Sequence, residues 1–189
     1  RTARGHWESG VMLGHFLTWL FRPFGTKSRA MRLEPLTAIS PIDGRYRGTT
    51  EALAAYFSES ALMRMRLIVE CEYLAALSET KGVGIRPLTD SEKALLRALP
   101  DISVEDAQII QKIEREGYEG IPATNHDVKA VEYFLKEKVA AVPALHAVSE
   151  FIHFACTSED INNLSHALML QSARQDVVLP YWRKIIEAL

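Results

Sequence analysis

The chain has 189 residues, of which 48% are hydrophobic and 24% are charged, and its formal net charge at pH 7 is −2. These values are typical of a folded globular protein and exclude disordered, collagen-like and low-complexity chains. A slightly acidic chain is a poor match for nucleic acid, whose binding proteins present basic surfaces. The longest apolar run, residues 11–21, is shorter than the roughly 20 apolar residues that cross a bilayer. We therefore expect no nucleic-acid partner and no membrane span.

The two cysteines, Cys71 and Cys156, lie far apart in the sequence and form no C-x-x-C pair. Because no disulfide framework is indicated, a reducing compartment is the simplest interpretation, and we expect a cytoplasmic protein. Residues 1–30 are expected to be an extension or a transit-like segment outside the fold, with organelle targeting as the alternative. Up to residue 34, basic side chains outnumber acidic ones: Arg1, Arg4, Arg22, Lys27, Arg29 and Arg32 against Glu8 and Glu34.

Residues 31–48 are rich in glycine and proline, which predicts loops and turns. Beyond them the chain is predicted to be helical, because apolar residues recur at helical spacing and no sustained period-two alternation occurs. Capping residues predict three helix starts in the first half: Ser58 for a helix to about Glu79, Thr89 with Glu92 for a helix that Pro100 ends, and Ser103 with Asp106.

In the second half, Thr124 and Asn125 are expected to cap a strongly periodic helix. A short helix is predicted over residues 144–155, and a long one from Ser158 onward, which Pro180 must kink or interrupt. The long helix is apolar on more than one face, so it needs burial against an oligomer or further sequence. The predicted fold class is all-α, a helical bundle.

Three polar clusters fall at a turn or at a helix start: residues 43–46, 124–127 and 157–160. In the first, Arg45 offers planar donors that suit phosphate or carboxylate, and Tyr46 adds a hydroxyl. The other two lie where free backbone N–H groups and the helix dipole favour an anion.

The second and third clusters add side chains suited to such an anion. Asn125 and His126 can donate to it, whereas Asp127 can orient a histidine or accept from a ligand amine. Thr157 and Ser158 contribute hydroxyl groups. The alternative for all three clusters is structural: an exposed turn and two ordinary helix caps, including a capping box from Thr157 to Asp160.

Glu150 and His153 form an E-x-x-H pair, with His146 one turn earlier. Di-metal helical bundles use this spacing, but they need a second copy and two more glutamates, and the sequence has no second copy. Phosphate-binding, dinucleotide-binding and hydrolase motifs are also missing. We expect no metal and no cofactor.

Three segments carry a family resemblance: LTAISPIDGRY (residues 36–46), TNHDVKAVEYFL (124–135) and FIHFACTSEDINNLSHAL (151–168). Together they resemble the bacterial-type adenylosuccinate lyases of the fumarase/aspartase superfamily, over about residues 31–189. The resemblance implies an N-terminal helical domain over residues 31–146 and the start of the central helical bundle, cut after its first long helix, over residues 147–189.

The resemblance also implies a carbon–nitrogen lyase of purine biosynthesis. The family eliminates fumarate from adenylosuccinate to give AMP, and from the succinyl-aminoimidazole-carboxamide ribotide. It acts as a homotetramer in which each active site takes residues from three subunits. The implied roles are the phosphate end of the substrate for Arg45 and Tyr46, substrate contact for Asn125, His126 and Asp127, and the succinyl carboxylates for Thr157 and Ser158.

Two features of the family are missing from these residues. Its general acid is a histidine in a T-H-x-Q stretch and its base is a serine in a flexible loop, and neither motif occurs here. Residues 117–122 also look like an inserted loop beside the second motif. We therefore expect an N-terminal part that binds substrate but has no catalytic residue of its own, inactive and poorly soluble alone. The alternative is a non-catalytic helical interaction module that binds a partner helix through residues 161–189.

Overall fold

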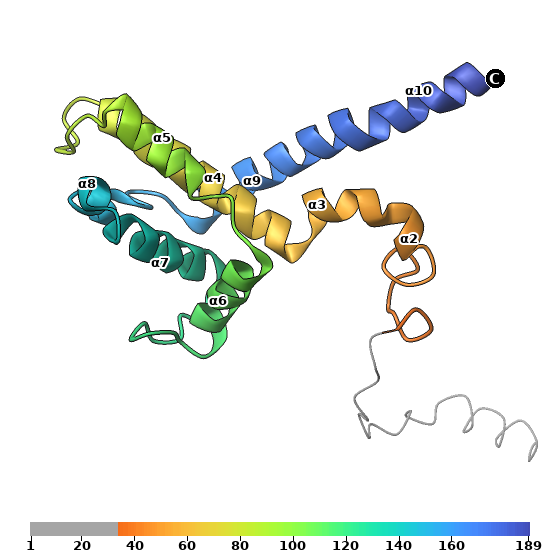
Figure 1. The fold of residues 1–189 in the computed structure, drawn as a ribbon, viewed down its shortest axis with the longest axis horizontal. Coiled ribbons are helices and arrows are strands. Elements are labelled where there is room, and N and C mark those ends of the chain that lie inside the picture. Colours follow the sequence, from red (N-terminus) through yellow and green to blue (C-terminus); the bar gives the residue numbers. More distant parts are fainter. Residues whose placement is uncertain (1–33) are drawn as a thin grey trace, which may run out of the picture. The chain divides into compact units, whose positions relative to one another are not determined.

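The computed structural model describes residues 34–189, so the predicted extension over residues 1–30 lies outside the described residues. The chain divides into two units, one that ends at Arg47 and one over Gly48–Leu189. Among residues 34–189 the regular structure is helical apart from one isolated β-bridge between Tyr118 and Ile121, which confirms the all-α prediction (Figure 1). The elements are α2 (Arg47–Thr50), η1 (Glu51–Leu53), α3 (Ala54–Phe57), α4 (Glu59–Glu79), α5 (Asp90–Ala98), α6 (Val104–Arg115), α7 (Asp127–Ala140), α8 (Pro143–His146), η2 (Ser149–Phe151), α9 (Ser158–Ala173), η3 (Arg174–Val178) and α10 (Leu179–Ala188).

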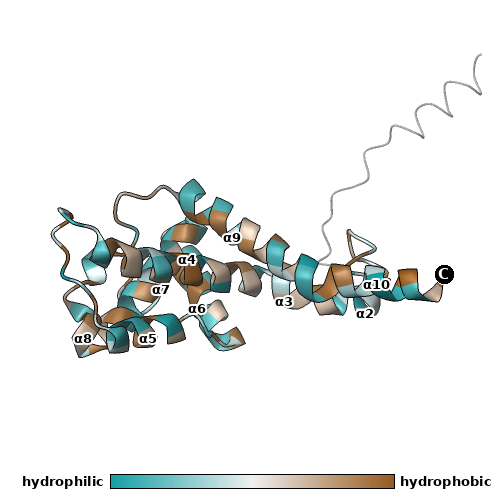
Figure 2. Cartoon of the chain, turned by 90° about the horizontal axis from the view of Figure 1, so that it is seen from above, coloured by the Kyte–Doolittle hydropathy of each residue, from teal (hydrophilic) through white to brown (hydrophobic). Residues whose placement is uncertain are grey.

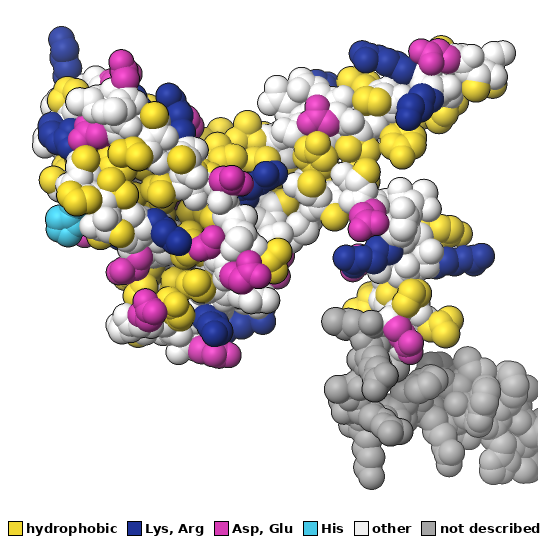
Figure 3. All heavy atoms as spheres, in the orientation of Figure 1, with side chains coloured by type: hydrophobic (Ala, Val, Ile, Leu, Met, Phe, Trp, Pro, Cys, Tyr) yellow, Lys and Arg dark blue, Asp and Glu magenta, His cyan; other side chains and the backbone are white. Residues whose placement is uncertain are grey.

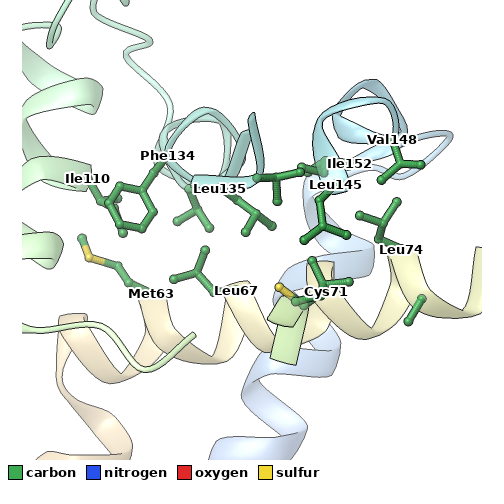
Figure 4. Packing of buried hydrophobic residues seen from close by; sticks show 14 of the residues in the cluster. Met63, Leu67, Cys71, Leu74, Ile110, Phe134, Leu135, Leu145, Val148 and Ile152 are labelled. Carbon is green, nitrogen blue, oxygen red and sulfur yellow. The ribbon is translucent and has the colours of Figure 1, made fainter. Parts of the chain in front are cut away.

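Helix α4 is the central element of the second unit. It packs against α7 on one side and α9 on another, and α6 packs against α7 (Figure 1). Leu67 and Leu74 of α4 and Leu135 of α7 are completely buried between these helices (Figure 4). Removing this apolar surface from water supplies the main driving force for the fold. The core therefore fixes α7, whose start carries part of the candidate site, against α4.

The three predicted helix starts of the first half are confirmed. Ser58 Oγ accepts a hydrogen bond from the Ala61 N–H, and α4 begins at the next residue. Capping boxes close the starts of α5 and α6, with Glu92 and Asp106 reaching back to the N–H groups of Thr89 and Ser103. Each cap satisfies backbone donors that the first helical turn leaves free.

The capping residue Glu92 predicts an acid-sensitive contribution to stability. The Arg86 guanidinium, at 2.6 and 2.9 Å, and the Thr89 N–H lower the pKa of Glu92 from 4.5 to about 2. A carboxylate with a depressed pKa in the folded state stabilises that state above its unfolded pKa and loses the effect as pH falls. In urea unfolding, we expect the stability difference between the wild type and Glu92→Gln to shrink from pH 4.5 towards pH 2.

A variant at the exposed Glu105 at the start of α6 is the control. The stability difference between this variant and the wild type should not change with pH as the Glu92→Gln difference does. A Glu92→Gln difference that stays constant across the same range would contradict the assignment.

Two predicted helix boundaries are wrong. The N-cap of α7 is His126, not Thr124 or Asn125. The predicted helix over residues 144–155 is broken into α8 and the short η2, and the backbone then turns left-handed at His153 and Ala155, both with φ of 59°. After η2, a buried carboxylate of α4, described below, holds His153 out of a helical conformation, so the helix does not continue to residue 155.

Pro180 interrupts the regular α-helix, as predicted. The segment directly before α10, Arg174–Val178, forms a π-helical turn of five residues. Pro180 lies in the first turn of α10. A wider turn accommodates a residue that has no N–H and whose ring crowds the preceding turn.

The need of the long helix for a partner stays a prediction, and the exposure of α10 supports it. Helix α10 has no buried residue in this chain, and hydrophobic side chains recur on its surface (Figures 2 and 3). Its large exposed apolar residues are Leu179, Tyr181, Trp182, Ile185 and Ile186.

Candidate functional site

The structure brings the second and third polar clusters together. His126 is the N-cap of α7, and Ser158 is the first residue of α9. The His126 Nε2 lies 3.3 Å from the Ser158 Oγ, although 32 residues separate them in the sequence. Two helix N-termini therefore meet side by side, and each presents the positive end of a helix dipole, which favours an anion.

The end of α6 fixes the start of α7. The Thr124 N–H donates to the Ile113 carbonyl at 3.0 Å, and the Asn125 N–H donates to the Glu114 carbonyl at 2.8 Å. Asn125 has a left-handed φ of 49°, which asparagine tolerates better than most residues. This turn leaves the Asn125 side chain exposed and directs the chain into α7 at His126.

Hydrogen bonding assigns the tautomer of His126. The Lys129 N–H donates to His126 Nδ1 at 3.3 Å, so this nitrogen is an acceptor. A neutral imidazole then carries its proton on Nε2, the nitrogen that faces Ser158. Half of the His126 side chain is exposed, so the same N–H is within reach of a ligand that approaches Ser158.

Asp127 is held as a carboxylate. Its Oδ2 accepts from the Arg66 NH2 at 2.6 Å and its Oδ1 accepts from the Val128 N–H at 2.9 Å. Partial burial raises the pKa of Asp127, but the hydrogen bond and charge of Arg66 outweigh burial and hold the pKa below its ordinary value. An ionised carboxylate only accepts hydrogen bonds, so Asp127 suits a donor on a ligand and not one of its anionic groups.

The two hydroxyl residues at the start of α9, Thr157 and Ser158, have different roles. The N–H and the hydroxyl of Thr157 both donate to Asp160 Oδ2, at 2.8 and 3.1 Å, which confirms the predicted capping box. These two hydrogen bonds lower the pKa of Asp160. The Thr157 hydroxyl therefore caps its own helix, whereas the Ser158 hydroxyl faces His126 across the site.

A small apolar cluster lies beneath the two helix starts. Val69 of α4, Val128 of α7 and Ile161 of α9 are buried against one another. Val128 follows Asp127 directly, and Ile161 lies three residues after Ser158. Packing of these three side chains holds α7 and α9 against α4 just under the polar groups.

Sequence analysis missed two buried charged residues of α4 that contact these motifs. Arg66 donates to Asp127 and to the Asn162 Oδ1 of α9, and Glu70, one turn later, binds His153. The His153 Nδ1 lies 2.5 Å from Glu70 Oε1, and the His153 N–H donates to Glu70 Oε2 at 3.1 Å. The signal was an Arg and a Glu on either side of the apolar run over residues 67–69, because such residues are buried only when paired.

Arg45 and Tyr46 belong to the other unit, and their part in the site stays a prediction. The Arg45 guanidinium lies over the Tyr46 ring, 5.6 Å from its centre, and both side chains are exposed. Gly44 before them is buried, and a Cβ there would lie 2.7 Å from the Ala38 Cβ. The tight turn that presents Arg45 therefore requires glycine at position 44.

The E-x-x-H pair does not come together as a metal site. Glu150 forms an ion pair with Lys136 at 3.5 Å, whereas His153 turns to Glu70. Within residues 34–189, no three His, Cys, Asp or Glu side chains gather in a way that could hold a metal ion. None of the helices in the same range is long and apolar enough to cross a membrane. Cys71 and Cys156 are free thiols.

An apolar groove lies beside the site, between α4 and α9. It has a volume of about 630 Å³, and its lining includes Ile68, Tyr73 and Leu164. Neither His126 nor Ser158 lines it. Because most of its surface is apolar, the groove suits hydrophobic packing and not an anionic ligand.

The chain is similar in sequence to known lyases. The sequence model of a family described as "Lyase" matches residues 44–189. The chain is 53% identical over 161 residues to the adenylosuccinate lyase of Escherichia coli (strain K12). It is 50% identical over the same length to that of Haemophilus influenzae, and 43% identical to that of Buchnera aphidicola subsp. Acyrthosiphon pisum.

These alignments cover 84% of this chain but only 34% of each relative, so the chain spans about a third of the length of the curated relatives it matches. The family model, in contrast, covers most of the chain and includes both helix starts of the site. The chain therefore belongs to the lyase family.

Proposed function

We propose that this chain is the N-terminal part of an adenylosuccinate lyase. The assembled enzyme eliminates fumarate from adenylosuccinate to give AMP, and from the succinylated carboxamide ribotide of purine biosynthesis. The observation that carries the proposal is the contact between His126 and Ser158, at 3.3 Å, which unites two motifs of a chain 53% identical to a named adenylosuccinate lyase. The alternative, a non-catalytic helical module, draws only on the exposed apolar surface of α10.

The proposed reaction needs what this site offers. In β-elimination a base removes a carbon-bound proton, the carbon–nitrogen bond breaks, and an acid protonates the leaving nitrogen. Negative charge develops on the neighbouring carboxylate, and donors aimed at it lower the barrier. The start of α9 with Ser158, and the Nε2–H of His126, are such donors. The acid and the base come from parts of the enzyme beyond this chain.

The other candidate residues take the remaining substrate groups. We assign the phosphate end to Arg45 and Tyr46, the succinyl carboxylates to Thr157 and Ser158, and further substrate contacts to Asn125, His126 and Asp127. Because the Thr157 hydroxyl is engaged in the capping box with Asp160, we expect Thr157 to contribute to binding mainly through the start of its helix.

We also propose a cytoplasmic homotetramer. The large apolar residues left exposed on α10 support assembly through this helix, since a monomer rarely exposes so much contiguous apolar surface. The two free thiols fit a reducing compartment.

The test of this function is fumarate release from adenylosuccinate by the complete protein. Replacing His126 with asparagine is the sharpest variant, because an asparagine oxygen still caps α7 while the Nε2–H is lost. We expect kcat/KM to fall roughly tenfold, the cost of a lost substrate hydrogen bond, and His126→Ala to lose stability in addition.

The exposed His166 of the same α9 is the matched control, and His166→Asn should retain full activity. A complete protein that releases no fumarate would refute the proposed function and leave the interaction module. Full activity in His126→Asn would instead remove His126 from the site.

A further inference from the structure

We propose that Arg66 is a positioning residue that sets the relation between the two helix starts of the site. This inference rests on the proposed function, because the value of that geometry is the binding of an anionic substrate. Arg66 itself touches neither His126 nor Ser158; it acts through Asp127 and Asn162, which belong to the two helices that carry them.

The guanidinium of Arg66, on α4, bridges α7 and α9. Its NH2 donates to Asp127 Oδ2 at 2.6 Å and its Nε donates to Asn162 Oδ1 at 3.0 Å. The two acceptors lie 61 and 96 residues away along the chain. Because a guanidinium is a rigid planar fork, two hydrogen bonds to it fix the distance and the angle between their acceptors.

Burial makes this bridge obligatory. Arg66 is only 5% exposed, and its side chain lies in the interior while half of the Asp127 side chain remains in solvent. A buried charge that loses its partner costs far more than an exposed one, so alternative positions of α7 and α9 that break the bridge are disfavoured. The bridge therefore selects one arrangement of the two helices.

The bridged residues lie next to the ligand-facing ones. Asp127 follows His126 in the chain, and Asn162 lies one helical turn after Ser158 on the same face of α9. The Asn162 amide also donates to Glu159 Oε1 at 3.4 Å, which holds its oxygen towards Arg66. The separation of His126 and Ser158 thus follows from contacts that Arg66 makes underneath.

The test compares Arg66→Met with Arg66→Lys and with a matched control, Arg86→Met. Arg86 also bridges two elements, with hydrogen bonds to Glu92 and to the Ala144 carbonyl at 2.7 Å, but it contacts none of the site motifs. All variants are made in the complete protein and assayed at a temperature where each is fully folded.

We expect Arg66→Met to lower kcat/KM roughly tenfold to a hundredfold, because small misplacement of binding groups has effects of this size, and Arg86→Met to retain wild-type kcat/KM. Arg66→Lys keeps the buried charge but cannot form the two-armed bridge, so it should restore melting temperature more fully than kcat/KM. Equal losses of kcat/KM in Arg66→Met and Arg86→Met would overturn the inference.

Amide hydrogen exchange provides a readout that does not depend on turnover. In Arg66→Met the amides of residues 127–130 and 158–161 should exchange faster than in the wild type, with no such change in Arg86→Met. Unchanged exchange at both helix starts would overturn the positioning role. If the exchange result holds while the wild-type protein releases no fumarate, the proposed function fails and the positioning role stands.

Discussion

Replacing Glu70 with alanine lowers the free energy of unfolding by about 3–5 kcal/mol, the loss expected when buried donors lose their acceptor and a cavity is left behind. Glu70 has no exposed surface, and both of its oxygens bind His153, one at the ring and one at the backbone N–H. Without it, a backbone donor and an imidazole nitrogen lose their acceptor in the interior, and a cavity remains.

Loss of the Glu70 contacts should also disturb the candidate site, because the segment that Glu70 holds leads directly into α9. His153 and Ala155 both take a left-handed φ of 59°, which costs energy in residues other than glycine. The contacts of Glu70 compensate for that cost. Urea unfolding followed by circular dichroism measures the effect.

Glu72→Ala is the matched control, two residues along the same helix. Glu72 is exposed and binds Arg97 at 2.6 and 2.9 Å, and surface pairs of this kind contribute about 0–1 kcal/mol. A loss of similar size in both variants would show that the buried pair with His153 is not what stabilises this region.

If the proposed phosphate role of Arg45 is right, we expect Arg45→Ala to weaken substrate binding by the complete protein by about 2–4 kcal/mol, provided that the phosphate contact is desolvated in the assembled site. This corresponds to a change in Kd of roughly 30-fold to 1,000-fold. The physical reason is the loss of charge-assisted hydrogen bonds from a planar guanidinium to phosphate, which no nearby neutral group replaces. Isothermal titration with AMP, the phosphate-bearing product of the proposed reaction, measures it directly.

Arg47→Ala is the control for charge alone. Arg47 lies two residues further on, is equally exposed, and forms an ion pair with Asp43 at 2.7 Å. Its removal should leave the affinity for AMP within about a factor of two, since surface pairs contribute little. Unchanged affinity in Arg45→Ala would exclude Arg45 from the phosphate site.

Local patterns predicted most of the helices. The helix starts capped by Ser58, Thr89, Ser103 and Thr157 depend on hydrogen bonds between residues three positions apart. Both partners of each bond therefore lie within one short stretch of sequence. The non-helical end of this segment was missed because Glu70, which binds His153, lies 83 residues away from it in the sequence. No local pattern around residues 144–155 opposes a helix, so propensity predicted one there and a tertiary contact overrode it.

The sequence by itself determined the helical class, the caps of α4, α5, α6 and α9, and the identity of the polar groups at two helix starts, since these depend on neighbouring residues and on residue type. Only the tertiary structure decided which of those groups face each other, and that Thr157 caps its helix while Ser158 meets His126. It also revealed Arg66 beneath them, since a buried charge is explained only by partners that folding brings from elsewhere in the chain.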